Sequence, residues 1–113
     1  MSNAGGDPPV PGDIEQALAL FRAQFAASLP ARMQDANTAL QACRATPDDD
    51  APLQDLHRVL HRLAGSAGTF GWPEFGAACR VIEDELEAML LQPARTVADF
   101  DRIAAAIAAL PKP

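Results

Sequence analysis

The chain of 113 residues carries a net charge of −6, and 49% of its residues are hydrophobic while only 5% are aromatic, so it can form one domain with a single modest core. The acidic balance disfavours nucleic acid as a partner, because binding to a duplex needs clustered Lys and Arg. No apolar run approaches the roughly 20 residues that span a bilayer and no leader resembles a signal peptide, so we expect a cytoplasmic protein without membrane contact.

The N-terminal part of the chain divides into a tail and a first helix. Residues 1–12 contain three Pro and three Gly and are expected to be disordered; Ser2 to Ala4 resemble the remnant of a cloning tag. The folded domain is expected to run from residue 13 to residue 111. Ser28 to Pro30 is expected to end the first helix, because Pro suits the first turn of a new one. Asp13 would cap this first helix, whose apolar stripe is Ile14, Leu18, Phe21 and Phe25.

A second helix is expected from Pro30 to about Arg44, followed by an acidic loop from Thr46 to Pro52. The loop contains three successive carboxylates, Asp48 to Asp50. Consecutive loop carboxylates without further ligands are usually solvated, so we interpret Asp50 as a helix cap and not as part of a metal site. The second helix has one apolar face, formed by Leu29, Met33, Ala36, Leu40 and Cys43.

The segment from Leu53 to Trp72 predicts a central helix and the turn that leaves it. On a wheel of 3.6 residues per turn, His61 points roughly 120° away from the centre of the packed stripe and stands on the exposed flank. Its neighbours on that flank include Arg58 and two residues without side chains, Gly65 and Gly68. Another protein could therefore approach the imidazole closely. The packed stripe consists of Leu53, Leu56, Leu60, Leu63 and Ala67.

Two further helices are expected after this turn. Gly68 and Gly71 would provide the tight or left-handed backbone that ends the central helix, and Pro73 would open the next one. Its inward face is expected to consist of Phe75, Ala78, Cys79, Ile82, Leu86 and Met89. Thr96 to Asp99 has the pattern of a capping box and starts a last helix with the stripe Phe100, Ile103, Ile107 and Leu110. The sequence therefore predicts an all-α fold, an antiparallel four-helix bundle with an additional helix at the N-terminus that is either short or merged with the next one.

A family resemblance begins at His61. Residues 61–67 read His-Arg-Leu-Ala-Gly-Ser-Ala, with Gly71 shortly after. This string resembles the signature of the histidine phosphotransfer (HPt) domain, which runs His-x-Leu-Lys-Gly-Ser/Ala-Ala. The pattern of Cys79, Ile82 and Glu83 resembles the second landmark of the family, a small residue or Cys followed by Leu-Glu on the next helix. The resemblance covers residues 14–110, and one position departs from it, since Ala64 stands where the family usually has Lys.

The resemblance implies a helical bundle that carries a phosphoryl group on His61. It implies a phosphorelay intermediate of two-component signalling, which exchanges this group with the aspartate of response-regulator receiver domains and works with a sensor histidine kinase. The receiver domain would supply the Mg²⁺, so the chain is expected to need no cofactor of its own. Because the sequence contains no nucleotide fingerprint, we expect a monomer without kinase activity.

The departure at Ala64 raises the question of which cation contacts the phosphoryl oxygens. Arg58, Arg62 and Arg80 are available, and Arg58 lies closest to His61 on the helical wheel. We therefore expect Arg58 to take this role. Glu83, on the adjoining helix, is expected to accept a hydrogen bond from the far nitrogen of the imidazole and to fix its tautomer.

Two other features are interpreted as structural. His57 and His61 have the i, i+4 spacing that can bind zinc from one helix face, but the pair lacks a third ligand. Arg58 also occupies the place where the HExxH motif needs a glutamate, so we expect no metal site and a partly buried His57. Cys43 and Cys79 lie on apolar stripes, which favours buried, reduced thiols over a disulfide.

Three classes of function stay open at this stage. The first is the phosphorelay intermediate, and the second is a non-phosphorylated interaction bundle, a degenerate HPt domain, to which Ala64 points. The third is a metal-binding helix pair. Zinc titration separates the third class from the others, and incubation with a phosphorylated receiver domain separates the first from the second.

Overall fold

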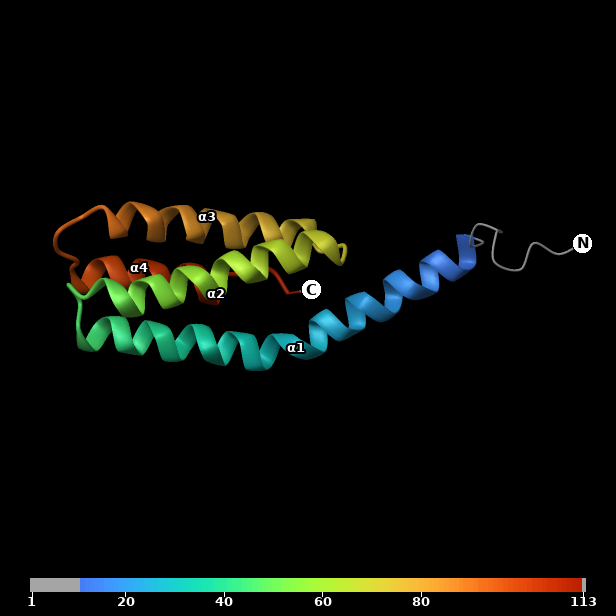
Figure 1. Ribbon diagram of the computed structural model, residues 1–113, viewed down its shortest axis with the longest axis horizontal. Coiled ribbons are helices and arrows are strands. Elements are labelled where there is room, and N and C mark those ends of the chain that lie inside the picture. Colours follow the sequence, from blue (N-terminus) through green and yellow to red (C-terminus); the bar gives the residue numbers. More distant parts are fainter. Residues whose placement is uncertain (1–10, 113) are drawn as a thin grey trace, which may run out of the picture.

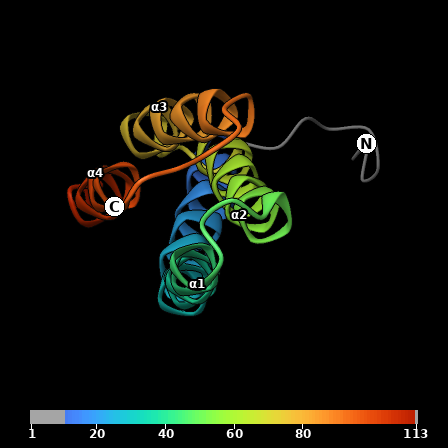
Figure 2. The same cartoon turned by 90° about the vertical axis from the view of Figure 1, so that its left-hand side faces the viewer.

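The computed structural model describes residues 11–112, and α-helices provide all regular secondary structure in this range. Figure 1 shows α2, α3, α4 and the C-terminal part of α1 side by side, and Figure 2 shows the helices end-on. The helix α2 packs against both α1 and α3, while α4 contacts α1 and α3. The predicted all-α, four-helix architecture is confirmed. The bounds are α1 Pro11–Ala45, α2 Asp50–Thr69, α3 Pro73–Leu90 and α4 Val97–Ala108.

The core of the bundle lies on the stripes that the periodicity predicted. Along α2 the whole predicted stripe is buried, together with Ala64. The helix α3 buries its predicted face except Ala78, which is half-buried, and α4 buries all of its stripe except Leu110. Burying one large aliphatic or aromatic side chain stabilises the fold by about 1.5–3 kcal/mol, so these stripes hold the four helices together. Within residues 11–112, no helix is long and apolar enough to cross a membrane.

The break predicted at Ser28 to Pro30 is wrong, because α1 continues through Pro30 as one helix of 35 residues. Of the two forms expected for the additional N-terminal helix, the structure has the merged one and not the short one. Proline removes one intrahelical hydrogen bond and crowds the preceding turn, which bends a helix when packing holds both sides in place. Leu29 and Ala36, on either side of Pro30, are buried against the bundle. Figure 1 shows α1 bending where it leaves the other helices.

The first part of α1 extends beyond the other helices, and the molecule measures 68 × 22 × 19 Å along its principal axes (Figure 1). All residues from 12 to 24 are exposed. Of the apolar stripe predicted there, only Phe25 is buried, while Ile14, Leu18 and Phe21 are solvent-exposed. A tail was predicted over residues 1–12. Residues 1–10 lie outside the described part of the chain, and residues 11 and 12 belong to α1.

The helix ends agree with the predictions in part. The capping box of Thr96 and Asp99 is confirmed. The N-cap of α2 is Asp49, whose carboxylate accepts from the backbone N of Ala51 at 3.0 Å, so the predicted cap at Asp50 is wrong by one residue. Gly71 has a φ of 84°, in the left-handed region that favours glycine, whereas Gly68 belongs to α2.

Candidate functional site

The two histidines of α2 differ in exposure, as the helical wheel predicted. The side chain of His61 is 69% exposed, whereas that of His57 is 24% exposed. Their rings are stacked at 12° with centroids 6.3 Å apart, one helical turn from each other. Only His61 therefore offers an open imidazole to a macromolecular partner.

Glu83 in α3 holds the ring of His61 from one side. Its Oε2 lies 2.6 Å from Nδ1 of His61, and its side chain is only 12% exposed. A carboxylate can only accept a hydrogen bond, so Nδ1 carries a hydrogen and donates it to Glu83. In the neutral ring, Nε2 then keeps its lone pair. The contact expected between Glu83 and the imidazole is present, and it leaves Nε2 as the ring nitrogen that faces away from Glu83.

The glycines beside His61 lie on an open surface. A Cβ atom added to Gly65 or to Gly68 would meet no other atom within 4 Å. Gly76 of α3 is the opposite case, since an added Cβ would come within 3.2 Å of the carbonyl oxygen of Ala64. Gly65 and Gly68 therefore leave room for a partner, whereas Gly76 leaves room for α2.

A groove runs along this face from His61 to the end of α2. It is lined by His61, Arg62, Gly65, Ser66, Thr69 and Phe70 of this segment, and by Arg32 of α1. Arg32 donates a hydrogen bond to Ser66 Oγ at 3.1 Å, and its guanidinium carbon lies 5.5 Å from the ring centroid of Phe25. Sequence reasoning missed Arg32, because only the packing of α1 against α2 brings it to this groove.

The structure places the three candidate cations at different positions around His61. Arg58 lines a second groove with His61 and Glu83, and it donates to Asp55 Oδ1 at 2.9 Å. Arg62 lines the groove described above, and Arg80 is exposed on α3. Ala64, at the position of the family Lys, is 2% exposed. This position therefore places no positive charge beside His61.

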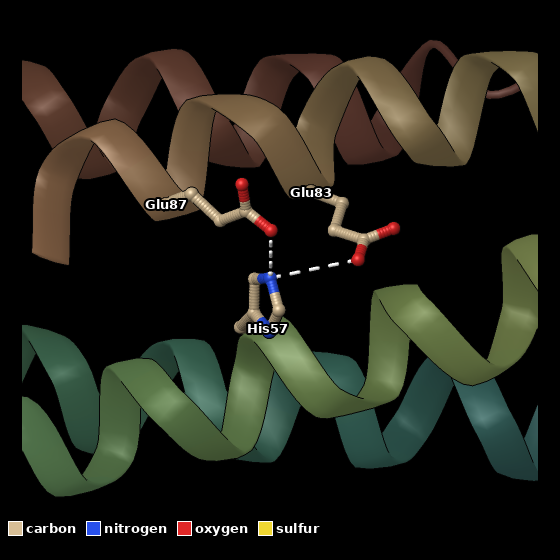
Figure 3. A group of neighbouring side chains, drawn as sticks. All are labelled: His57, Glu83 and Glu87. Atoms are coloured by element: carbon tan, nitrogen blue, oxygen red, sulfur yellow. Dashed lines mark hydrogen bonds and ion pairs between the residues drawn. The ribbon is translucent and has the colours of Figure 1, made fainter.

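His57 faces the same helix as His61 but pairs mainly with a different carboxylate. Figure 3 shows its Nε2 atom between two side chains of α3, with Glu87 Oε1 at 3.0 Å and Glu83 Oε2 at 3.6 Å. These two contacts hold the ring of His57 at the edge of the bundle, and its partial burial agrees with the prediction. Glu87 was not among the predicted site residues.

Arg95, in the loop before α4, is a buried charge that the sequence analysis did not single out. Its side chain is 1% exposed, its Nη2 donates to Asp50 at 2.6 Å and its Nε donates to the carbonyl of Met89 at 3.0 Å. Its backbone N also donates to Asp48 at 3.1 Å. The acidic loop therefore joins α2 to the α3–α4 loop, which supports the interpretation of its carboxylates as structural.

The two cysteines are free and buried, as predicted. Burial raises the pKa of Cys43 to about 11, although the charge of Arg95 acts in the opposite direction. Burial, and after it the charge of Glu83, raises the pKa of Cys79 to about 11. Both thiols are therefore protonated at neutral pH and are poor nucleophiles.

Comparison with known proteins identifies the family. A sequence model described as the Hpt domain matches residues 20–112, which include α2, α3 and α4 in full. No curated protein and no solved structure match the chain. The family match covers most of the sequence, including the exposed histidine and the carboxylate that holds it. The chain therefore belongs to the Hpt domain family.

Proposed function

We propose that this chain is a phosphorelay intermediate that accepts a phosphoryl group on His61 from the aspartyl phosphate of a receiver domain and donates it onward. Membership of the Hpt family implies histidine phosphotransfer in phosphorelay signalling. The assignment to His61 rests on one observation: its ring is 69% exposed while its Nδ1 is held 2.6 Å from Glu83. This combination presents Nε2 to a partner in a fixed orientation.

In the proposed transfer, the Nε2 lone pair attacks phosphorus in line. The N–P bond forms as the P–O bond to the aspartate breaks, and the electron pair of that bond stays on the aspartate oxygen. Nδ1 keeps its hydrogen, so the ring becomes positively charged, and the nearly buried carboxylate of Glu83 stabilises that charge. Such a transfer depends on positioning and charge neutralisation more than on covalent machinery. The reverse reaction passes the group to a second receiver domain.

The partners follow from this chemistry. The receiver domain contributes the aspartate and its Mg²⁺, and a sensor histidine kinase supplies the phosphoryl group upstream. The chain itself therefore needs no kinase activity. We propose that it acts as a monomeric carrier in the cytoplasm. Arg58, in the groove with His61, is the proposed contact to the phosphoryl oxygens. We expect Arg58→Ala to slow single-turnover transfer about tenfold, the lower end of what a charge-assisted hydrogen bond contributes. Arg62→Ala and Arg80→Ala are the matched comparisons.

The test is phosphorylation by phosphoramidate, a small donor that needs no docking, followed by transfer from a phosphorylated receiver domain. We expect an acid-labile, base-stable phosphate on the wild-type chain. His61→Gln should abolish it, while His57→Gln should retain most of it. Label on His57, or label that survives in His61→Gln, would contradict the assignment.

A non-phosphorylated interaction bundle is the second candidate, and the alanine at position 64 is the observation that favours it. The labelling and transfer experiment described above also separates the two candidate functions. A degenerate bundle would bind a receiver domain without becoming labelled by it or by phosphoramidate. ATP-dependent autophosphorylation of the purified chain would contradict both.

A further inference from the structure

Two i, i+4 pairs face each other across α2 and α3. His57 and His61 lie one turn apart on α2, and Glu83 and Glu87 lie one turn apart on α3. His57 Nε2 lies 3.0 Å from Glu87 and 3.6 Å from Glu83 (Figure 3). His61 Nδ1 lies 2.6 Å from Glu83. The sequence showed only the histidine pair, which lacked a third ligand. The fold adds two carboxylates from the neighbouring helix.

We propose that His57, Glu83 and Glu87 form a binding site for a divalent transition-metal ion, with Zn²⁺ as the best match. One ligand atom from each of the three residues lies within 4.8 Å of the other two. Imidazole nitrogen and carboxylate oxygen bind Zn²⁺ at about 2.0–2.2 Å, so tetrahedral donors lie about 3.3 Å apart. The distances of 3.0 and 3.6 Å from the imidazole nitrogen lie on either side of that value. The imidazole nitrogen therefore already lies near the required spacing from both carboxylates, and the two carboxylate oxygens lie within 4.8 Å of each other.

The charges around the site favour a cation. Two carboxylates face the ion, and the chain as a whole has a net charge of −6. Arg58 lines the same groove, but its charge is offset by Asp55 at 2.9 Å. In the metal-free chain Nε2 of His57 donates its hydrogen to Glu87, so a metal ion can bind Nε2 only after that hydrogen has moved to Nδ1. Three protein ligands leave a fourth position for water.

The site shares Glu83 with His61, and this connects metal binding to the proposed function. A metal ion on Glu83 withdraws negative charge from the carboxylate that stabilises the phosphorylated imidazole. Bound zinc should therefore slow phosphoryl acceptance by His61. This consequence rests on the proposed function, whereas the metal site itself does not.

The experiment is titration of the metal-free chain with ZnCl₂ by calorimetry, and with Co²⁺ by visible absorption. We expect one equivalent of Zn²⁺ to bind, and Co²⁺ to show tetrahedral d–d bands without a thiolate charge-transfer band, which excludes Cys43 and Cys79 as ligands. His57→Gln and Glu87→Gln should each weaken binding more than about tenfold, the least that even an outer-shell partner contributes. Asp84→Asn removes the same charge from the exposed surface of α3 and should leave binding unchanged.

The outcomes are separable. Absence of stoichiometric binding, or binding that His57→Gln and Glu87→Gln leave intact in a folded chain, overturns the site. Zinc binding with an unchanged rate of labelling by phosphoramidate keeps the site and overturns its effect on His61. A chain that binds zinc but is never phosphorylated overturns the proposed function and leaves the site standing.

Discussion

The Nδ1 atom of His61 and the Oε2 atom of Glu83 lie 2.6 Å apart and join the exposed flank of α2 to α3. A carboxylate that is 12% exposed thereby orients an imidazole that is 69% exposed. The orientation of the imidazole is set by a residue of the same chain and does not depend on a bound partner. In the proposed transfer, the attacking imidazole is therefore preorganised by a residue of the same chain.

Replacing Glu83 by Gln should test this role. The amide keeps an acceptor oxygen but loses the negative charge that stabilises the phosphorylated ring, so we expect phosphoryl acceptance to slow about tenfold, or about 1.4 kcal/mol. Single-turnover labelling gives the rate, and ¹⁵N NMR of His61 shows whether the hydrogen stays on Nδ1. Glu87→Gln, which alters a contact of His57 alone, is the matched control. An unchanged rate and tautomer in Glu83→Ala would contradict the positioning role.

The open face can be tested with two glycines. Gly65→Gln adds a side chain where a Cβ meets nothing within 4 Å, so the fold should persist and gain up to about 1 kcal/mol of helix propensity. Transfer from a receiver domain should fall severely, because a misplacement of about 1 Å can cost 100-fold. Labelling by phosphoramidate should remain near the wild-type rate.

Gly76→Ala is the structural counterpart of that variant. Its Cβ would lie 3.2 Å from the carbonyl of Ala64 and 3.3 Å from the Cβ of Ala67, so α2 and α3 must separate slightly. We expect a loss of about 1–3 kcal/mol, measured by urea unfolding. Equal stability of Gly76→Ala and wild type would mean that the helices are less closely packed than described.

Arg95→Ala should destabilise the bundle by about 1–3 kcal/mol, because it removes two hydrogen bonds of a buried guanidinium, one to the carbonyl of Met89 and one that joins Asp50 to the loop before α4. Thermal unfolding measures the loss. Arg102→Ala removes an exposed arginine that pairs with Asp99 within α4, and it should cost less than about 1 kcal/mol. Similar losses in the two variants would show that the buried position of Arg95 is not what matters.

The cysteines should make stability sensitive to alkaline pH. Their pKa is about 11 in the folded chain against an ordinary value of 9.0, so the unfolded thiols lose protons first. The contribution of the two protonated thiols to the free energy of unfolding is complete below pH 9 and is lost as the pH rises towards 11. Urea unfolding across this range gives the trend, and native thiols should react slowly with a disulfide reagent at pH 8. Reaction of the native chain at the rate of the denatured chain would contradict this burial.

The spacing of hydrophobic residues was sufficient to predict the buried face of helices that pack against two neighbours. The stripe of α2 repeats in steps of three and four and has partners on both α1 and α3, so sequence spacing and burial agree from Leu53 to Ala67. At the start of α1 the same spacing predicted a buried stripe that the structure does not have. Ile14 and Leu18 have the pattern of a packed stripe, but the other helices do not reach them.

Contacts across helices were less accessible to sequence reasoning. Family resemblance indicated Glu83, but Glu87 and Arg32 reach the histidines or their groove only through the register of one helix against another. The break predicted at Pro30 failed for a related reason. Local rules place proline at helix starts, while burial of Leu29 and Ala36 holds the helix on both sides of it.

The protruding start of α1 has a consequence for amide hydrogen exchange. Residues 12–20 are exposed, so their backbone hydrogen bonds can open by fraying from the N-terminal end of α1, at little cost in free energy. The part from Leu29 to Ala45 packs against the bundle through the buried residues Leu29, Ala36, Leu40 and Cys43, so we expect its hydrogen bonds to be more strongly protected. Pro30 has no amide hydrogen and interrupts the ladder between the two regions. We therefore expect one continuous helix to behave as two cooperative units, with exchange rates along α1 that change most steeply just before Pro30.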